Sequence, residues 1–148
     1  SLTSITIPDS IATIGDATIG DYTFRNCNSL TSITVPDGVT SIGHSAFYDC
    51  TSLTSITIPD SVTNIGHSAF FGCTSLTSIT IPDSVTNIGT WAFRRCSDMT
   101  TVTFLGDAPQ TGEKVFSKSI PTIYRKPEAK GWGDTFAGRP VKIISENP

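Results

Sequence analysis

Positive charge is scarce in the first 105 residues of this 148-residue chain. Residues 1–105 contain no Lys and no Glu, and they hold eight Asp against three Arg. Residues 106–148 reverse the balance, with seven Lys and Arg against five Asp and Glu. Because nucleic-acid binding requires clustered cations, this distribution argues against nucleic acid as the main partner.

Long apolar runs are also missing. No window approaches the roughly 18 apolar residues that a membrane span requires, and no signal peptide is visible. The chain has no initiator Met and begins directly at the start of a repeat, so we expect it to be a fragment of a longer protein. Localisation therefore stays open on these grounds.

Enzyme signatures are missing as well, since the sequence contains no GxSxG, HExxH or P-loop motif. The two histidines, His44 and His67, lie at equivalent repeat positions. A catalytic site needs dissimilar residues that converge, whereas repeat positions supply similar ones. We therefore predict a protein that is not an enzyme and has no cofactor.

Paired cysteines of the CxxC type are absent too, which argues against a zinc site. The four cysteines instead follow one another at intervals of 23 residues. One cysteine per repeat predicts a column of buried free thiols, because parallel side chains on stacked units are poorly oriented for a disulfide. The column consists of Cys27, Cys50, Cys73 and Cys96.

What the sequence does contain is a repeat. Its clearest copy is LTSITIPDSVTNIGHSAFFGCTS, which begins at Leu53 and recurs from Leu76 and, more loosely, from Leu30. Repetition at a period of 23 residues indicates stacked supersecondary units, that is, a solenoid.

Each unit predicts two short extended segments and a turn. Apolar residues two apart, as in Ile56 and Ile58, indicate a strand with one buried face. Pro59 ends that strand because it has no N–H to donate, and Val-Thr-x-Ile forms a second extended piece. The following glycine, such as Gly66, fits a turn that needs positive φ or close backbone approach. Phe70 and Cys73, three residues apart, predict one short helical turn facing the core.

The repeat L-x-x-I-x-I-P-x-x-V-x-x-I-G-x-x-A-F-x-x-C resembles the bacterial BspA-like, or treponemal-type, leucine-rich repeat from Leu2 to about Thr103. The resemblance implies a curved solenoid with a parallel β-sheet on its concave face. It also implies a secreted or surface protein, often of a host-associated microbe, that works in adhesion or another binding role.

The two ends of the array depart from the period. The first unit has five extra residues near Ile14–Thr18, where we expect a bulge, and Ile19, Phe24 and Cys27 then return to register. Residues 106–148 contain a degenerate repeat with Val115-Phe116, a strand after Pro121 and further short segments. Since a solenoid must shield its end, we expect this tail to be a C-terminal cap. The open N-terminal strand edge could pair with another copy, so end-to-end self-association is predicted there.

Two surfaces are candidates for binding a partner. The first comprises hydroxyl side chains that point outward from the strands, which also suit a strand simply by β-propensity. They are Ser4, Thr6, Ser32, Thr34, Ser55, Thr57, Ser78, Thr80, Thr101 and Thr103. The second lies where the repeats vary, since exposed neighbouring aromatics mark interaction patches. Its members are Tyr48, Phe71 and Trp91, although their rings could equally pack across the turns.

Metal binding is the weaker hypothesis at two further columns. His44, His67 and Asp21 form one, but zinc requires three or four ligands and the third is doubtful across the insertion. Asp9, Asp37, Asp60 and Asp83 form the other, and a turn role after proline explains these residues without calcium. We therefore predict no metal site.

The sequence predicts an α/β repeat solenoid, a single leucine-rich-repeat domain over residues 1–148. Its parallel sheet lies opposite short helical or 3-10 turns, with repeats in residues 1–105 and the degenerate repeat and cap in residues 106–148. The predicted function is an extracellular or cell-surface binding module, with a protein or glycan partner. The alternative is a structural spacer or assembly module in a larger surface protein.

Overall fold

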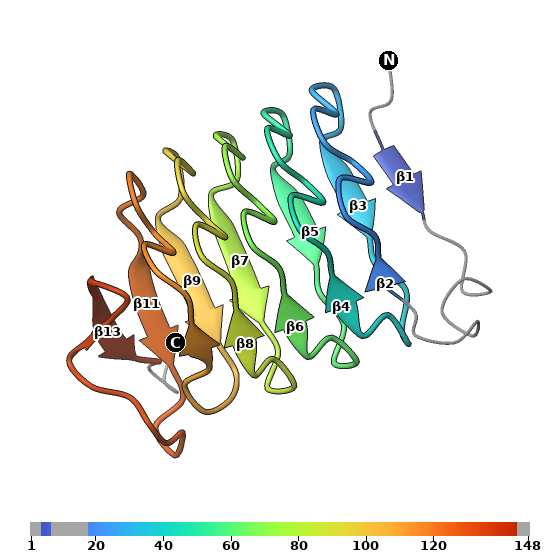
Figure 1. The fold of residues 1–148 in the computed structure, drawn as a ribbon. Helices are drawn as coiled ribbons and strands as arrows, with labels where there is room; N and C mark the ends of the chain where they lie inside the picture. The colour runs from blue at the N-terminus through green and yellow to red at the C-terminus, as the bar shows by residue number, and fades with distance from the viewer. Residues whose placement is uncertain (1–3, 7–17, 145–148) are drawn as a thin grey trace.

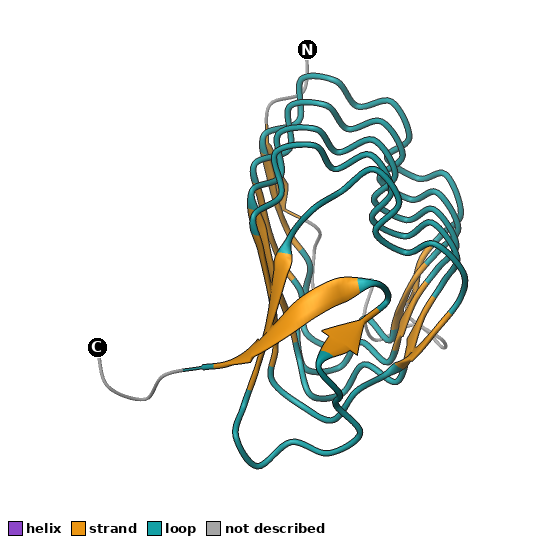
Figure 2. Ribbon diagram, turned by 90° about the vertical axis from the view of Figure 1, so that its left-hand side faces the viewer, coloured by secondary structure: helices purple, strands orange, loops and turns teal. Residues whose placement is uncertain are grey.

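The computed structural model of the chain describes residues 4–6 and 18–144 and shows a solenoid of stacked coils (Figure 1). Each coil has one strand on a long face and a shorter strand on the opposite side, and a row of turns joins them (Figure 2). Among the described residues none is helical, so no helix there could cross a membrane. The predicted solenoid with a parallel β-sheet is confirmed, whereas the helical part of the predicted α/β class is not, because the described residues form strands and turns.

Apart from the short strand β12, the paired strands on the long face run parallel and in register, as stacking similar units requires. Ser32 lies opposite Ser55, and Ser78 lies opposite Thr101, so equivalent residues form columns. The pairing order is β1-β3-β5 in one sheet and β7-β9-β11-β13-β12 in another. The strands are β1 (Ser4–Thr6), β3 (Ser32–Thr34), β5 (Ser55–Thr57), β7 (Ser78–Ile81), β9 (Thr101–Phe104), β11 (Thr122–Arg125), β12 (Thr135–Phe136) and β13 (Arg139–Ile143).

The long face therefore consists of two sheets rather than the one parallel sheet that the resemblance implies. Strands β5 and β7 are neighbours along the stack but do not pair in the described structure. Their coils have the same sequence, LTSITIPDSVTNIG, at Leu53–Gly66 and Leu76–Gly89, so local sequence does not explain the break.

The opposite side carries one continuous sheet in the order β10-β8-β6-β4-β2. Its strands have two residues each, and in the four repeat strands the second residue is a buried Ile, as the Val-Thr-x-Ile pattern predicts. Ile19 pairs with Ile42, so the array returns to register after the insertion. The bulge expected at residues 14–18 lies outside the described residues except at Thr18. The strands are β2 (Thr18–Ile19), β4 (Ser41–Ile42), β6 (Asn64–Ile65), β8 (Asn87–Ile88) and β10 (Gln110–Thr111).

The predicted helical turns are wrong. Along Ser45–Cys50, N–H groups alternate between two kinds of partner. Ala46, Tyr48 and Cys50 donate to carbonyls three residues back, at 3.1–3.2 Å. Ser45, Phe47 and Asp49 donate to carbonyls of the next coil, at 2.7–2.9 Å. In a helix, both sets of N–H groups would bond to carbonyls of the same segment. Here every second N–H bonds to the neighbouring coil, so the segment forms consecutive β-turns and not a helix.

Positive backbone angles make this turn pattern possible. The φ angles of Ser45 and Asp49 are 52° and 55°, and the equivalent positions of the following coil are Ser68 at 56° and Gly72 at 75°. Non-glycine residues adopt such angles at a cost of about 1 kcal/mol or more. The hydrogen bonds between coils offset that cost, because each turn amide that faces the neighbouring coil has a carbonyl partner there.

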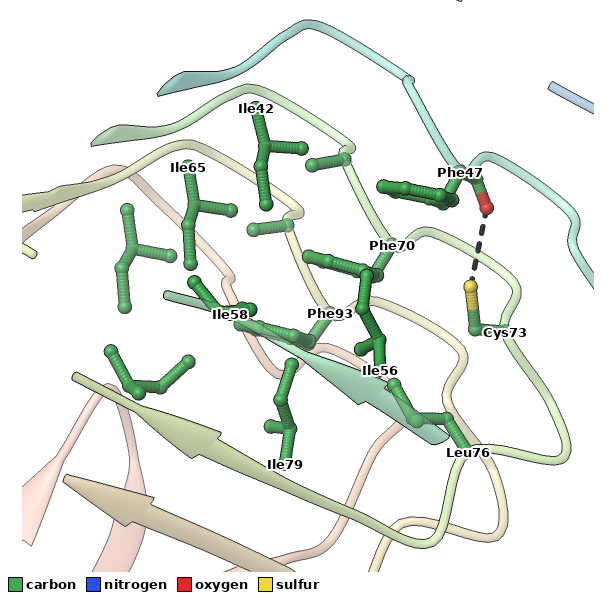
Figure 3. Close-up of a cluster of buried hydrophobic side chains, with 14 of the residues drawn as sticks. Ile42, Phe47, Ile56, Ile58, Ile65, Phe70, Cys73, Leu76, Ile79 and Phe93 are labelled. Atoms are coloured by element: carbon green, nitrogen blue, oxygen red, sulfur yellow. Dashed lines mark hydrogen bonds between the residues drawn. The ribbon is translucent and has the colours of Figure 1, made fainter. Parts of the chain in front are cut away.

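The core is a stack of identical layers (Figure 3). Phe rings follow one another at centroid distances of 5.3 Å from Phe24 to Phe47, 5.3 Å to Phe70 and 5.2 Å to Phe93. Phe116 continues the column at 5.7 Å, which confirms that Val115-Phe116 is a degenerate Ala-Phe. Beside the Phe column lie the buried columns of Leu, Ile and Val that the repeat pattern predicts.

The cysteines are free thiols, as predicted, and they have a hydrogen-bonding role that the spacing does not reveal. Cys73 Sγ donates to the Phe47 carbonyl at 3.2 Å (Figure 3), and the thiols of Cys50 and Cys96 donate in the same way to Phe24 and Phe70. Burial raises the pKa of Cys50 and Cys96 to about 12 and that of Cys73 well above its usual value. All three stay protonated donors at neutral pH.

In the fifth coil Ser119 takes the place of the cysteine. Its hydroxyl donates to the Phe93 carbonyl at 2.6 Å and accepts the Cys96 N–H at 2.9 Å. Ser119 is 3% exposed, and it is the natural precedent for an oxygen in this column.

This substitution predicts how the column responds to mutation. Cys73→Ser should lower the free energy of unfolding by no more than about 1 kcal/mol, because the hydroxyl can donate to the Phe47 carbonyl as the thiol does. Cys73→Ala should lower it by about 1 kcal/mol more, because this buried carbonyl loses one of its two donors. Urea unfolding of the three proteins measures the difference, and equal stability of the Ser and Ala variants would exclude the hydrogen-bonding role.

Alkaline pH should also weaken the fold through these thiols. Their folded pKa is raised, whereas an exposed thiol in the unfolded chain ionises near 9. Stability from the thiols is therefore complete below about pH 9 and is lost as pH rises toward 12. Melting temperature measured between pH 8 and pH 11 should fall more steeply for the parent than for a Cys50→Ser/Cys73→Ser/Cys96→Ser variant, which lacks these three buried thiols. Parallel profiles would be the contrary result.

Glycine is required in the turn column for close approach and not for positive φ. A Cβ on Gly66 would lie 2.8 Å from the backbone carbon of Gly43 and 2.9 Å from the Ile42 carbonyl oxygen. A Cβ on Gly89 would lie 2.5 Å from the His67 amide nitrogen. Neither glycine has a positive φ. Of the two reasons that the sequence offered, close approach is the correct one.

The C-terminal segment continues the long face and then turns across the end of the stack (Figure 2). The strand predicted after Pro121 is β11, and β13 pairs parallel to it. Among the further short segments, residues Thr135–Phe136 form β12, antiparallel to β13. Trp132 and Phe136 pack on Phe104 at ring distances of 5.0 and 5.1 Å. The role of residues 106–148 as a cap stays a prediction, as does the single-domain boundary.

Candidate functional site

The predicted strand-face hydroxyls lie on the long face, in columns set by the register of the strands. Ser55, Thr57, Ser78 and Thr80 are exposed, whereas Ser32, Thr101 and Thr103 are half-buried and Thr34 is exposed. The side chains of Ser4 and Thr6 lie outside the described residues. The break between β5 and β7 divides these columns, and a hollow of about 280 Å³ lies across it, lined by Ser55, Thr57, Ser78 and Thr80 among others.

The turn side carries two columns of large side chains. The first, which we name the histidine column, consists of Tyr22, His44, His67 and Trp91. The second, which we name the arginine column, consists of Arg25, Tyr48, Phe71 and Arg94. Together they form the turn face, one side chain of each column per coil.

Rings of the histidine column contact one another along the stack. His44 and His67 lie parallel, with centroids 4.8 Å apart. Tyr22 meets the edge of His44 at 5.2 Å, and Trp91 meets His67 at 5.4 Å. Tyr22 and Trp91 have positive φ, as do Ser45 and Ser68 in the two coils between them, but the two serines are buried. The sequence offered these histidines only as metal ligands, and their variable position is the one signal that placed them on this face.

The arginine column is a stack of rings with a cation at each end. Tyr48 and Phe71 lie parallel with centroids 4.5 Å apart, which confirms that they are neighbours. The Arg25 guanidinium lies 5.0 Å from the Tyr48 ring. Arg94 lies 5.5 Å from Phe71 and 5.0 Å from Trp91, and so joins the two columns. These contacts are cation–π interactions, which attract about 0.5–1 kcal/mol each at exposed sites.

Two hollows flank the arginine column. One, of about 310 Å³, lies between the two columns of the turn face. The other, of about 510 Å³, lies on the opposite side of the Tyr48–Phe71 pair, where Asn26, Asn28 and Arg95 are among the lining residues. Tyr48 and Phe71 therefore form an aromatic ridge between two grooves, with hydrogen-bonding side chains on either side.

The electrostatics of this face are those of a positive patch on a chain of net negative charge. Before Lys114 the chain has no Lys, and its three Arg are Arg25, Arg94 and Arg95. All three guanidinium groups lie against rings of the turn face. Burial, and then the neighbouring His44, lower the pKa of His67, so this imidazole is neutral at pH 7.

A third hollow, of about 760 Å³, lies near the C-terminal coils, and the sequence reasoning did not select it. Carboxylates of Asp83, Asp107 and Glu128 are among its lining residues. Asp107 accepts a hydrogen bond from the Lys130 amide at 2.8 Å.

The metal hypotheses have no geometry to support them. Among the described residues no three His, Cys, Asp or Glu side chains form a group that could hold a metal ion. His44 and His67 stack face to face rather than aim nitrogen atoms at one point, and Asp21 accepts the backbone N–H of His44 at 2.8 Å. Asp37, Asp60 and Asp83 are exposed turn residues, and Asp9 lies outside the described residues.

Comparison with known proteins identifies the repeat. The family model "BspA type Leucine rich repeat region" matches residues 17–124 in six copies. A comparison with curated proteins finds no match.

Several solved structures are similar to the chain. A leucine-rich repeat protein of T. pallidum is 28% identical with a TM-score of 0.73, over 83% of this chain and 58% of that one. A leucine-rich cell surface protein of Faecalibacterium prausnitzii is 36% identical with a TM-score of 0.63, over 85% of this chain and 38% of that one. The pneumococcal vaccine antigen PcpA is 22% identical with a TM-score of 0.69, over 97% of this chain and 36% of that one. At this identity the similarity shows the fold alone.

The chain thus spans 58% or less of the length of each of these three structures. The family match covers well over half of its residues and coincides with the coils described above. We conclude that the chain belongs to the BspA-type leucine-rich repeat family.

Proposed function

We propose that the chain is a binding module of a secreted or cell-surface bacterial protein and that it contacts a partner protein or glycan. Support comes from the family and from the F. prausnitzii relative, which is described as a cell surface protein. Repeat arrays of this kind present extended surfaces that suit macromolecular partners. The extracellular location is part of the same proposal.

The observation that carries the proposal is the composition of the turn face. Binding hot spots favour Trp, Tyr and Arg. Trp91, Tyr48, Tyr22 and the three Arg of the repeat array all lie here. From β3 to β9 the strand face presents Ser and Thr at its outward positions, which suits solubility as well as it suits a partner, and Tyr124 and Lys142 follow only on β11 and β13.

The mechanism would be passive. Ring stacking and guanidinium contacts hold the side chains of the turn face in place before a partner arrives. Backbone amides beneath them are bonded to the next coil. A surface ordered in this way loses little conformational entropy on binding, so more of the contact energy becomes affinity.

A binding screen tests this function. The folded chain is passed over immobilised extracellular-matrix proteins and a glycan array, and a saturable signal in the micromolar range or tighter is expected. A variant with Tyr48→Ser and Trp91→Ser should lose most of that signal, because truncation of aromatic hot spots costs about 2 kcal/mol or more each. The matched control, Thr57→Ala with Thr80→Ala, changes two exposed side chains of the strand face and should bind like the parent.

Other outcomes of the screen would redirect the proposal. Silence of the folded chain on both panels would contradict a binding module and favour the spacer. Binding that survives the turn-face changes but is lost with the strand-face changes would keep the function and move the site to the hollow between β5 and β7. If both double variants bound the partner as well as the parent does, neither face would be the binding site.

The two ends of the array belong to the proposal as well. We propose that residues 106–148 shield the last coil, since Trp132 and Phe136 cover Phe104 there. At the other end β1 has a pairing partner on one side within the described residues, so a second copy could pair with its free edge.

A further inference from the structure

We infer that the turn face binds an acidic glycan, a sulfated or uronic-acid oligosaccharide laid along the stack from Arg25 to Arg94 and Arg95. This inference rests on the proposed binding function and names its ligand class and its site.

Charge is the first argument. Residues 1–105 carry eight Asp and only three Arg, and all three Arg belong to this one face. An array that avoids cations elsewhere and gathers every one of them beside four aromatic rings has a local surface complementary to an anion. A neutral or cationic ligand would gain nothing from this arrangement.

The three guanidinium groups stack on rings, but carboxylates do not occupy their N–H donors in the described part of the chain. Within the described part of the chain, none of the three forms an ion pair with a carboxylate, and Arg94 Nε is buried without a hydrogen-bond partner. A guanidinium that stacks on a ring still presents its N–H donors in its own plane, where they match carboxylate or sulfate oxygens in pairs. Stacking therefore orders the donors in advance and leaves them available.

The rings add to the positive surface. Tyr48 and Phe71 cover one another with one face each, and Arg25 and Arg94 occupy the outer faces. What remains at the two grooves is chiefly the ring edges, which carry the positive end of the aromatic quadrupole. Cations and ring edges thus make the ridge itself positive, and the two arginines Arg94 and Arg95 outnumber the one carboxylate residue, Asp49, in the groove beside it.

The backbone of this face selects a glycan over an acidic peptide. An extended peptide commonly binds by adding a strand to free N–H and C=O groups. Here the amides of Ser45, Phe47 and Asp49 are already bonded to the next coil, as are those of Ser68 and Phe70. Recognition must come from side chains, and the flanking groove offers amide, hydroxyl and guanidinium groups of Asn26, Asn28, Thr51, Thr74 and Arg95, with Asp49 as its one carboxylate residue. Such groups suit a ligand covered with hydroxyls.

The spacing of the cations sets the size of the ligand. Arg25 and Arg94 belong to coils three steps apart, and neighbouring parallel strands are about 4.8 Å apart, so the guanidinium groups span about 14 Å along the axis. An oligosaccharide of several sugars, with an acidic group near each end of that span, would meet both cations at once.

The test is a calorimetric titration of the folded chain with a heparin-derived hexasaccharide, an oligogalacturonate, a neutral maltohexaose and a hexaglutamate peptide. Saturable binding of one or both acidic glycans is expected, with no binding of maltohexaose and weaker binding of the peptide. Affinity should fall on raising ionic strength toward about 1 M, where the Debye length is about 3 Å. The two acidic glycans distinguish sulfate from carboxylate as the preferred anion.

A pair of variants with equal charge locates the site. Arg25→Ala/Arg94→Ala should weaken binding of the acidic glycan by about tenfold or more, the loss expected for a charge-assisted hydrogen bond. Lys130→Ala/Lys142→Ala removes two exposed cations from the C-terminal segment and should leave the affinity unchanged. Melting curves establish that each variant folds. If the arginine variant does not fold, chemical-shift changes of Tyr48 and Phe71 in the parent give the same answer.

Four results would overturn the inference. They are no binding of either acidic glycan, equal binding of maltohexaose, equal or tighter binding of hexaglutamate, and equal losses in the two variants. If the screen identified a partner whose binding depends on Tyr48 and Trp91, and no acidic glycan bound, the binding function would stand and this ligand class would be rejected.

Discussion

Replacing Phe70 with Ala should lower the free energy of unfolding by about 3–5 kcal/mol. The Phe70 ring is fully buried and lies between Phe47 and Phe93, at centroid distances of 5.3 and 5.2 Å. Its removal leaves a cavity in the middle of the column, and the coils on both sides lose a stacking partner. Because the neighbouring coils are held at their spacing by backbone hydrogen bonds, the structure cannot close around the gap.

The adjacent residue provides a matched control. Phe71 is the same side chain one position later, but it is half-exposed and contacts Tyr48 and the arginines of the turn face. Phe71→Ala should cost about 1 kcal/mol, the worth of an aromatic pair at a surface. Urea denaturation of the two variants gives the comparison, and a cost for Phe71→Ala equal to that of Phe70→Ala would show that the ring column is not the core.

The second large effect concerns a glycine. Gly66→Ala should lower the free energy of unfolding by about 3 kcal/mol, at the upper end of the range for overpacking. The added Cβ would lie 2.8 Å from the Gly43 carbon, 2.9 Å from the His44 amide nitrogen and 2.9 Å from the Ile42 carbonyl oxygen. These are backbone atoms of the preceding coil, and no rotamer change can move them. The 2.8 Å bond from the Gly66 amide to Ile42 would be strained as well.

Gly133 serves as the control for this substitution. A Cβ there would have its nearest neighbour, the Thr135 carbonyl oxygen, at 3.8 Å, and its φ is not positive. Gly133→Ala should therefore change the melting temperature little, or raise it slightly by restricting the unfolded chain. If Gly66→Ala melted with the parent, the coils would have to be further apart than the structure places them.

Much of the fold could be predicted because the repeat displays it several times over. Apolar alternation at Ile56 and Ile58 predicted a strand, and Pro59 predicted its end. The 23-residue interval predicted that Phe47, Phe70 and Phe93 would form one column. Each of these features depends on residues that recur in every unit, so one sequence shows the same pattern several times.

The turns could not be predicted in the same way. A spacing of three between Phe70 and Cys73 fits a helical turn and a pair of β-turns equally well. The difference arises from amides such as that of Ser68, which bond to the next coil and not to their own. The thiol hydrogen bonds were hidden for the same reason, because the acceptor of Cys73 is a carbonyl 26 residues earlier.

The candidate site was predicted in part. Variation at Tyr48 and Phe71 indicated a surface and placed the two rings together. It did not reveal that Arg25 and Arg94 close the column, since the path of each side chain depends on the backbone angles of the turn. The hydroxyl columns were predicted as continuous, and the break between β5 and β7 divides them without a counterpart in the sequence.

We propose that the turn face, and not the strand face, binds the partner. Amide chemical shifts of the isotopically labelled chain, recorded as the heparin-derived hexasaccharide is added, distinguish the two faces. Saturable changes are expected at Arg25, Tyr48, Phe71 and Arg94, with none at Ser55, Thr57, Ser78 or Thr80. Changes confined to the strand residues, with the turn face silent, would contradict it.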